Sequence, residues 1–209
     1  MIILSHRGYW KLPEEKNTNK AFKRSFSLDY GTETDIRDHA GGLVISHDPS
    51  QKEAMSVESL FLTYTSQGKK LPLALNIKAD GLQKLLLAAL SKYNINDYFV
   101  FDMSVPDMLE YINSGLKVFT RQSELEFTPV LYEKSQGVWI DSFISNWIDE
   151  ATIKSHIDNE KQVCIVSPEL HKRPFKEEWY RLKRMSITGN PEVMLCTDYP
   201  EQARSFFNE

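Results

Sequence analysis

The chain has 209 residues, of which 41% are hydrophobic and 26% are charged, and its net charge is −4. This length fits one hydrophobic core better than two, and the composition is that of a soluble globular protein. The absence of a basic stripe argues against a nucleic acid partner, and no apolar run reaches the roughly 20 residues that span a bilayer. The apolar start, Met1 to Leu4, is too short for a signal peptide. We therefore expect a cytoplasmic protein without a transmembrane segment.

Short β-rich runs alternate with helical patterns along the whole chain. Eight runs predict strands, at residues 1–5, 31–36, 71–77, 98–102, 116–120, 138–140, 163–166 and 193–197. Helices are predicted between them, at residues 18–28, within 49–70, and at 81–93, 105–114, 147–157, 175–185 and 200–207. A further β-segment at residues 42–46 extends the loop after the second strand, and residues 121–137 favour only a short helix. Such alternation implies parallel strands joined by crossover helices.

Eight strand–helix units predict a single domain, residues 1–209, that folds as a compact (β/α)8 barrel. Barrels of this kind typically have about 250 residues. A doubly wound open sheet is the structural alternative. The barrel is favoured because the polar motifs described next fall at the carboxyl ends of predicted strands, where barrel active sites lie.

Two acids lie at the end of the second predicted strand. Glu33 and Asp35 are two residues apart, so both side chains point to the same face, which in a barrel is the inner face at the mouth. Two acids this close repel each other unless a positive charge lies between them. A hard divalent cation with oxygen ligands, Ca²⁺ or Mg²⁺, would remove that repulsion. The alternative is a solvated strand end with salt bridges to Arg37 or Arg7.

Two histidines flank the acids in the sequence. His6 ends the first predicted strand, and His47 precedes a turn at Asp48-Pro49. Because histidine titrates near neutral pH, one neutral and one protonated imidazole can serve as base and acid in a phosphoryl transfer. The alternative for either residue is a structural histidine in the core or on the surface.

Two cations are candidate phosphate contacts. Arg7 offers a guanidinium fork, and Lys78, at the end of the third predicted strand, offers a point charge. A lysine at a barrel mouth can also form a Schiff base with a carbonyl substrate. Nothing near Lys78 in the sequence favours that use over phosphate binding.

Taken in order, these motifs resemble those of the glycerophosphodiester phosphodiesterase family, within the superfamily that includes phosphatidylinositol-specific phospholipase C. The resemblance is carried by Ser5-His6-Arg7-Gly8, Glu33-Thr34-Asp35 and Ser46-His47-Asp48. Weaker similarities follow at Glu15-Lys16-Asn17-Thr18, Val100-Phe101-Asp102 and Thr197-Asp198-Tyr199-Pro200.

The resemblance implies a phospholipase-type barrel that cleaves a phosphodiester, either small or polymeric, with the help of a divalent metal. It implies that His6 and His47 are the general acid and base. It also implies a metal site of Glu33, Asp35 and the residue at position 76, and substrate contacts from Arg7, Lys78 and Asn17.

Three features depart from the family pattern. Asn76 stands where the family usually has an acidic third metal ligand, so metal affinity should be lower. The family's insertion after the His-Asp motif is missing, since only residues 49–70 separate that motif from the third strand. The seventh strand leads into a charged loop, Ser167 to Arg173, which we expect to recognise the substrate; the alternative is a solvated loop without that role. Two other functions stay open: a barrel that binds a phosphorylated ligand without cleaving it, and a lysine-dependent aldolase.

Overall fold

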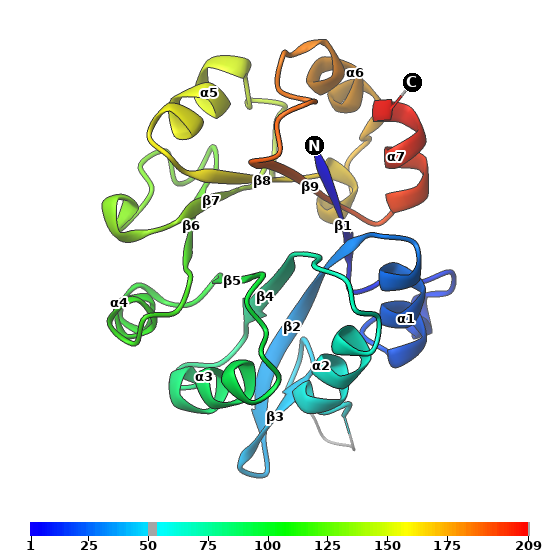
Figure 1. Ribbon diagram of the computed structural model, residues 1–209. Helices are drawn as coiled ribbons and strands as arrows, with labels where there is room; N and C mark the ends of the chain where they lie inside the picture. The colour runs from blue at the N-terminus through cyan, green and yellow to red at the C-terminus, as the bar shows by residue number, and fades with distance from the viewer. Residues whose placement is uncertain (50–53, 209) are drawn as a thin grey trace. The chain divides into compact units, whose positions relative to one another are not determined.

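The computed structural model describes residues 1–49 and 54–208. The chain consists of two compact units, one of Ser5–Val118 and one of Met1–Leu4 with Phe119–Glu209 (Figure 1). The first strand, β1 (Ile2–His6), contributes residues to both units. The expectation that residues 1–209 form one domain stays a prediction.

The Ser5–Val118 unit contains the predicted acids and histidines. Its remaining strands are β2 (Gly31–His39), β3 (Gly42–Ile45), β4 (Leu73–Ile77) and β5 (Tyr98–Phe101). Its helices are α1 (Asn19–Ser27), α2 (Val57–Thr65), α3 (Gln83–Lys92) and α4 (Val105–Asn113), with a 3₁₀ turn, η1 (Pro13–Glu15), before α1. The strand order is β5-β4-β2-β1, and β3 pairs antiparallel with the end of β2. The helix predicted within residues 49–70 is α2, and residues 50–53 of that stretch lie outside the described residues.

Helix α1 shows how local sequence determines where a helix of this unit begins and which face it buries. Thr18 caps its first turn by accepting a hydrogen bond from the backbone N–H of Ala21. Phe22 and Phe26, four residues apart, are both fully buried on the face that packs against the sheet. Helices α1, α2 and α3 pack side by side along β2 and β3 (Figure 1). Helix α1 packs against β2, in which residues 31–36 are all buried.

The second unit has the same alternation of strands and helices. Its strands are β6 (Phe119–Gln122), β7 (Gly137–Ile140), β8 (Gln162–Val166) and β9 (Val193–Thr197). Its helical elements are η2 (Tyr132–Lys134), α5 (Glu150–Asp158), η3 (Pro168–His171), α6 (Lys176–Arg184) and α7 (Pro200–Asn208). The strand order is β1-β9-β8-β7-β6, and the pairs from β6 to β9 are parallel.

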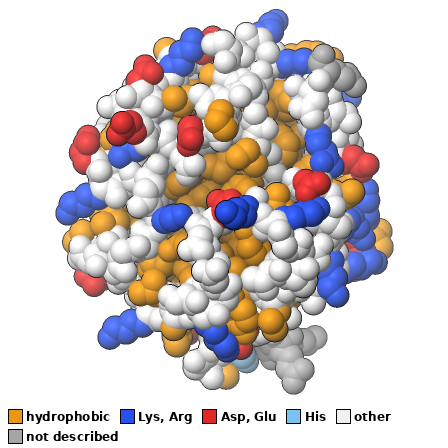
Figure 2. Space-filling model, viewed as in Figure 1, with side chains coloured by type: hydrophobic (Ala, Val, Ile, Leu, Met, Phe, Trp, Pro, Cys, Tyr) orange, Lys and Arg blue, Asp and Glu red, His pale blue; other side chains and the backbone are white. Residues whose placement is uncertain are grey.

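Apart from β3, the described residues form eight strands, and each of these is followed by a helical element. This is the topology of a (β/α)8 barrel, which confirms the predicted fold class. Strand β3 is the extra β-segment that the sequence predicted after the second strand. Among the described residues, none of the helices is both long and apolar enough to cross a membrane. Acidic and basic side chains are interspersed on the face seen in Figure 2, in keeping with the modest net charge of −4.

Candidate functional site

The predicted site forms at the carboxyl ends of β1, β2 and β4, within the Ser5–Val118 unit. Glu33 and Asp35 lie on the same face of β2, and Asp35 is the register neighbour of Asn76 on β4. Lys78 follows β4 directly, and its backbone N–H donates to Ile36 O at 2.9 Å. The polar side chains that the sequence singled out on these two strands therefore lie next to one another.

Asp35 is the centre of the cluster. One carboxylate oxygen, Oδ2, is 2.9 Å from Arg7 Nε and accepts a hydrogen bond of 2.8 Å from Asn17 Nδ2. The other oxygen, Oδ1, is buried and accepts no hydrogen bond within the described residues, although Lys78 Nζ lies 3.8 Å away. The side chain of Asp35 is only 1% exposed. Arg7 rather than Arg37 supplies the salt bridge that the sequence left open between them.

Glu33 is also buried, and its negative charge has weaker compensating contacts than that of Asp35. Its Oε2 lies 3.8 Å from His6 Nε2 and accepts a hydrogen bond of 3.2 Å from the backbone N–H of Arg7. Burial raises the pKa of the Glu33 carboxyl to about 7, and the charge of Asp35 adds to that rise. The nearby His6, Arg7 and Lys78 act in the opposite direction on that pKa. The site therefore holds a carboxyl group whose charge is poorly stabilised.

The loop after β1 has an unusual backbone that places Arg7 and Asn17. Arg7 has φ +57°, Gly8 φ +79° and Asn17 φ +59°, all in the left-handed region. The backbone N–H of Asn17 donates to Arg7 O at 2.9 Å, which ties the two ends of the loop together. Thr34 Oγ1 donates to Asn17 Oδ1 at 2.9 Å, so the amide NH₂ group points to Asp35. Backbone strain of this kind is common where side chains are held for function.

Lys78 is paired with an acid that the sequence argument gave no role. Its Nζ donates to Asp102 Oδ2 at 3.0 Å. Asp102 directly follows β5 and has φ +71°, another left-handed residue. Its place directly after the apolar run Tyr-Phe-Val-Phe, at the end of the predicted strand 98–102, was the available signal, since a charged residue at a strand end faces the mouth of a barrel.

His47 is linked to the cluster through the backbone. Glu33 O accepts from Arg7 N at 2.9 Å, and Asp35 O accepts from Ser46 N at 3.1 Å. Carbonyl groups two residues apart in a strand point to the same edge, so the segment with His47 follows β2 along the edge where β1 ends. The His47 ring pairs through Nδ1 with Asp48 Oδ1 at 2.9 Å, and its side chain is 49% exposed.

Three oxygen donors of this cluster could hold a divalent cation. Asp35 Oδ1 and Asn76 Oδ1 are buried acceptors that have no hydrogen-bond partner within residues 1–49 and 54–208. Such groups are rare in folded proteins, and a hard cation would satisfy both of them together with Glu33. No group of three or more His, Cys, Asp or Glu side chains in the described chain could hold a metal. The candidate set is of another kind, with two carboxylates, Glu33 and Asp35, and the amide oxygen of Asn76.

The charged loop Ser167 to Arg173 lies in the other unit. Some of its side chains form hydrogen bonds or ion pairs there. His171 Nε2 lies 2.8 Å from Asp141 Oδ1, and Arg173 Nη1 donates to Ser142 O at 2.7 Å. Arg173 Nη2 also donates to Asn146 Oδ1 at 2.6 Å. These contacts give Arg173 a structural role in holding the loop after β7. Recognition of the substrate by this loop stays a prediction.

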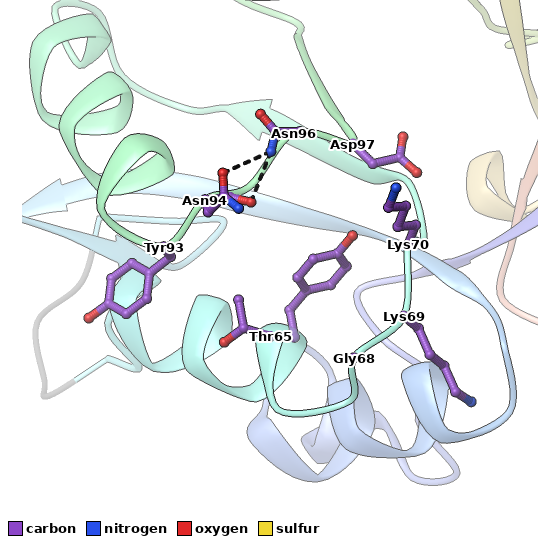
Figure 3. A pocket seen from close by; sticks show the side chains of 9 residues that line it. Thr65, Gly68, Lys69, Lys70, Tyr93, Asn94, Asn96 and Asp97 are labelled. Carbon is purple, nitrogen blue, oxygen red and sulfur yellow. Dashed lines mark hydrogen bonds between the residues drawn. The ribbon is translucent and has the colours of Figure 1, made fainter.

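A hollow of about 460 Å³ lies elsewhere in the Ser5–Val118 unit (Figure 3). It is lined by the last residues of α2, by the segment between α2 and β4, and by the segment between α3 and β5; among these residues are Tyr64, Lys70, Tyr93 and Asp97. These segments precede β4 and β5, so the hollow lies at the amino ends of the strands, opposite to the acids. Tyr64 is also engaged, since its hydroxyl donates to Leu71 O at 3.0 Å. The hollow is therefore separate from the predicted site.

Comparisons with known proteins agree with this architecture. No protein-family model matches the chain, and no curated protein sequence does. Solved structures do match. A glycerophosphodiester phosphodiesterase from Agrobacterium tumefaciens has a TM-score of 0.72 at 12% identity, with 100% of both chains covered. A phosphodiesterase from Oleispira antarctica, in complex with the product sn-glycerol-3-phosphate, has a TM-score of 0.69 at 13% identity, covering 100% of this chain and 97% of that one.

A third match is more distant. A Ca²⁺-dependent phosphatidylinositol-specific phospholipase C from Streptomyces antibioticus has a TM-score of 0.55 at 10% identity, covering 99% of this chain and 95% of that one. At these identities the likeness concerns the fold. The chain therefore has the fold of the glycerophosphodiester phosphodiesterases, as its motifs predicted.

Proposed function

We propose that the chain is a metal-dependent phosphodiester hydrolase, with a glycerophosphodiester as the default substrate and another small or polymeric phosphodiester as the alternative. The observation that carries the proposal is the buried cluster at the ends of β1, β2 and β4. In it, Asp35 and Asn76 each present an oxygen that lacks a hydrogen-bond partner within the described residues. The fold shared with phosphodiesterases supports the same reaction class.

The proposed metal ligands are Glu33, Asp35 and Asn76, and the proposed ion is Ca²⁺ or Mg²⁺. Once bound, the ion would supply a Lewis acid that neutralises charge on a phosphoryl oxygen. The Ca²⁺ dependence of the Streptomyces phospholipase supports a divalent ion. The poorly stabilised charge of Glu33 supports it as well, because a cation would favour the ionised carboxylate.

The proposed general acid and base are His6 and His47. His6 Nε2 faces the Glu33 carboxyl at 3.8 Å, which places the ring beside the proposed metal ligands. His47 uses Nδ1 to pair with Asp48, which leaves Nε2 to take or give a proton.

The proposed substrate contacts are Arg7, Asn17 and Lys78. Arg7 balances the charge of the buried Asp35, and Asn17 donates a hydrogen bond to the same oxygen, Oδ2. The ion pair of Lys78 with Asp102 gives this lysine an electrostatic role and offers no support for Schiff-base chemistry.

A barrel that binds a phosphorylated ligand without cleaving it is the second candidate, favoured by the amide at Asn76 in place of a third acid. His47→Ala separates the two functions. For a hydrolase, the substitution should lower kcat about 10²- to 10⁴-fold while binding of inorganic phosphate is kept. A wild-type chain that binds phosphate but turns over no phosphodiester with Ca²⁺, Mg²⁺ or Mn²⁺ would favour the binding function.

A further inference from the structure

Three cationic side chains, Arg7, Arg37 and Lys78, lie around the end of β2, and they differ in their partners. Arg7 is paired with Asp35 at 2.9 Å, and Lys78 is paired with Asp102 at 3.0 Å. Arg37 pairs with no carboxylate among the described residues. Its guanidinium makes one hydrogen bond there, from Nη2 to His47 O at 3.3 Å.

The position of Arg37 is set by the strand. Arg37 is two residues beyond Asp35 on β2, so its side chain leaves the same face as the proposed metal ligands. Parallel pairing of β2 with β4 runs to Ile36 and Ile77, and Lys78 N continues it by donating to Ile36 O. The next residues along the two strands, Arg37 and Lys78, therefore flank the open end of the acidic cluster.

The donors of Arg37 are largely unused. A guanidinium has five N–H groups, and Arg37 Nε is buried with no hydrogen-bond partner in the described part of the chain. A buried donor without an acceptor costs free energy that an arriving anion can recover. Planar guanidinium groups match phosphate oxygens in pairs, and such charge-assisted hydrogen bonds are among the strongest in proteins.

We propose that Arg37 binds the phosphoryl group of the ligand through its guanidinium, while its bond to His47 O holds the His47 segment beside the same group. The proposal rests on the function proposed above for the location of the phosphoryl group. It assigns to Arg37, rather than to the carboxylate-paired Arg7 and Lys78, the main ionic contact with the anion. A phosphomonoester, a phosphodiester and inorganic phosphate share the chemistry that this contact requires.

The test is calorimetric titration of the full chain with inorganic phosphate, for wild type, Arg37→Met, Arg37→Lys and Arg184→Met. Arg184 is an exposed arginine at the end of α6, so Arg184→Met removes the same charge away from the site. We expect Arg37→Met to weaken phosphate binding about 10- to 100-fold, and Arg37→Lys to weaken it less, because lysine keeps the charge without the fork. Arg184→Met should bind like wild type.

Phosphate affinity that is equal in Arg37→Met and wild type overturns the proposal, as does a wild type that binds no phosphate. Should Arg37→Met fail to fold, Arg37→Lys decides, because wild-type affinity in that variant would exclude the guanidinium contact. Hydrolysis of bis(p-nitrophenyl) phosphate is measured on the same samples. If phosphate binding depends on Arg37 but the wild type hydrolyses no phosphodiester, the proposed hydrolase function is refuted. The proposed contact between Arg37 and phosphate is then kept.

Discussion

Replacing Glu33 by glutamine should stabilise the metal-free protein at neutral and alkaline pH. Glu33 is 2% exposed, and burial beside Asp35 raises its pKa from 4.5 to about 7. The folded chain therefore holds a proton between these pH values that the unfolded chain releases. It follows that this carboxyl lowers the free energy of unfolding progressively as the pH rises from about 4.5 to 7. Glutamine keeps the shape and an acceptor for Arg7 N but carries no charge.

The size of the effect follows from the pKa. One pKa unit corresponds to about 1.36 kcal/mol, so a rise from 4.5 to about 7 is equivalent to about 3 kcal/mol. With EDTA present, Glu33→Gln should exceed wild type in free energy of unfolding by about 3 kcal/mol at pH 8. At pH 4.5 the difference should nearly vanish, because Glu33 is then protonated in the folded chain.

The assay is urea unfolding followed by circular dichroism at both pH values, with EDTA and again with 10 to 100 times the wild-type Kd of Ca²⁺. Saturating metal should stabilise wild type by about 1.4 to 2.7 kcal/mol and leave Glu33→Gln nearly unchanged, because the variant lacks one carboxylate ligand. Equal stability of the two proteins in EDTA at pH 8 would refute the claim that Glu33 carries a buried and poorly stabilised charge. Equal stabilisation of wild type and Glu33→Gln by Ca²⁺ would show that Glu33 is not a metal ligand.

Three further substitutions, one of them with a matched control, test separate parts of the site. Asn76→Asp should tighten Ca²⁺ binding about tenfold in calorimetry, because a third carboxylate joins the donor set, and unchanged affinity would place residue 76 outside it. Gly8→Ala should cost about 3 kcal/mol in urea unfolding, because φ is +79° and the new Cβ would lie 2.8 Å from a side-chain carbon of α1. Gly41→Ala, with φ +80° and open space around it, is the matched control and should cost about 1 kcal/mol; equal costs would contradict the packing argument. Asp48→Asn should lower kcat less than tenfold, because the Asp48 side chain is 88% exposed and screened by water, and a loss as large as that of His47→Ala would show a stronger role for Asp48.

Much of the fold could be predicted because each element has a strong local signal. The eight predicted strands all correspond to observed strands within a few residues, since each is a short β-rich run between helical patterns. In the least certain segment, residues 121–137, the helical structure is limited to the 3₁₀ turn Tyr132–Lys134. No periodic apolar face marks this stretch, and the predicted short helix was the most that the pattern could support.

The pairing of charges within the site could not be predicted from the sequence. Spacing alone placed Glu33 and Asp35 on one face, but it did not show that Arg7 binds Asp35 or that Asp102 binds Lys78. Those contacts depend on left-handed backbone at Arg7 and Asp102, which no propensity argument predicts for such residues. Arg37 appeared in the sequence only as a possible salt-bridge partner of the acids, and its place beside His47 depends on the β2–β3 hairpin.

The most direct test of the account is turnover of glycerophosphocholine and bis(p-nitrophenyl) phosphate with Ca²⁺, Mg²⁺ or Mn²⁺, with EDTA, and in His6→Ala. The account predicts hydrolysis that requires a divalent metal, stops in EDTA, and falls at least about 10²-fold in His6→Ala. Hydrolysis that continues unchanged in EDTA or in His6→Ala would contradict the site and the mechanism proposed for it.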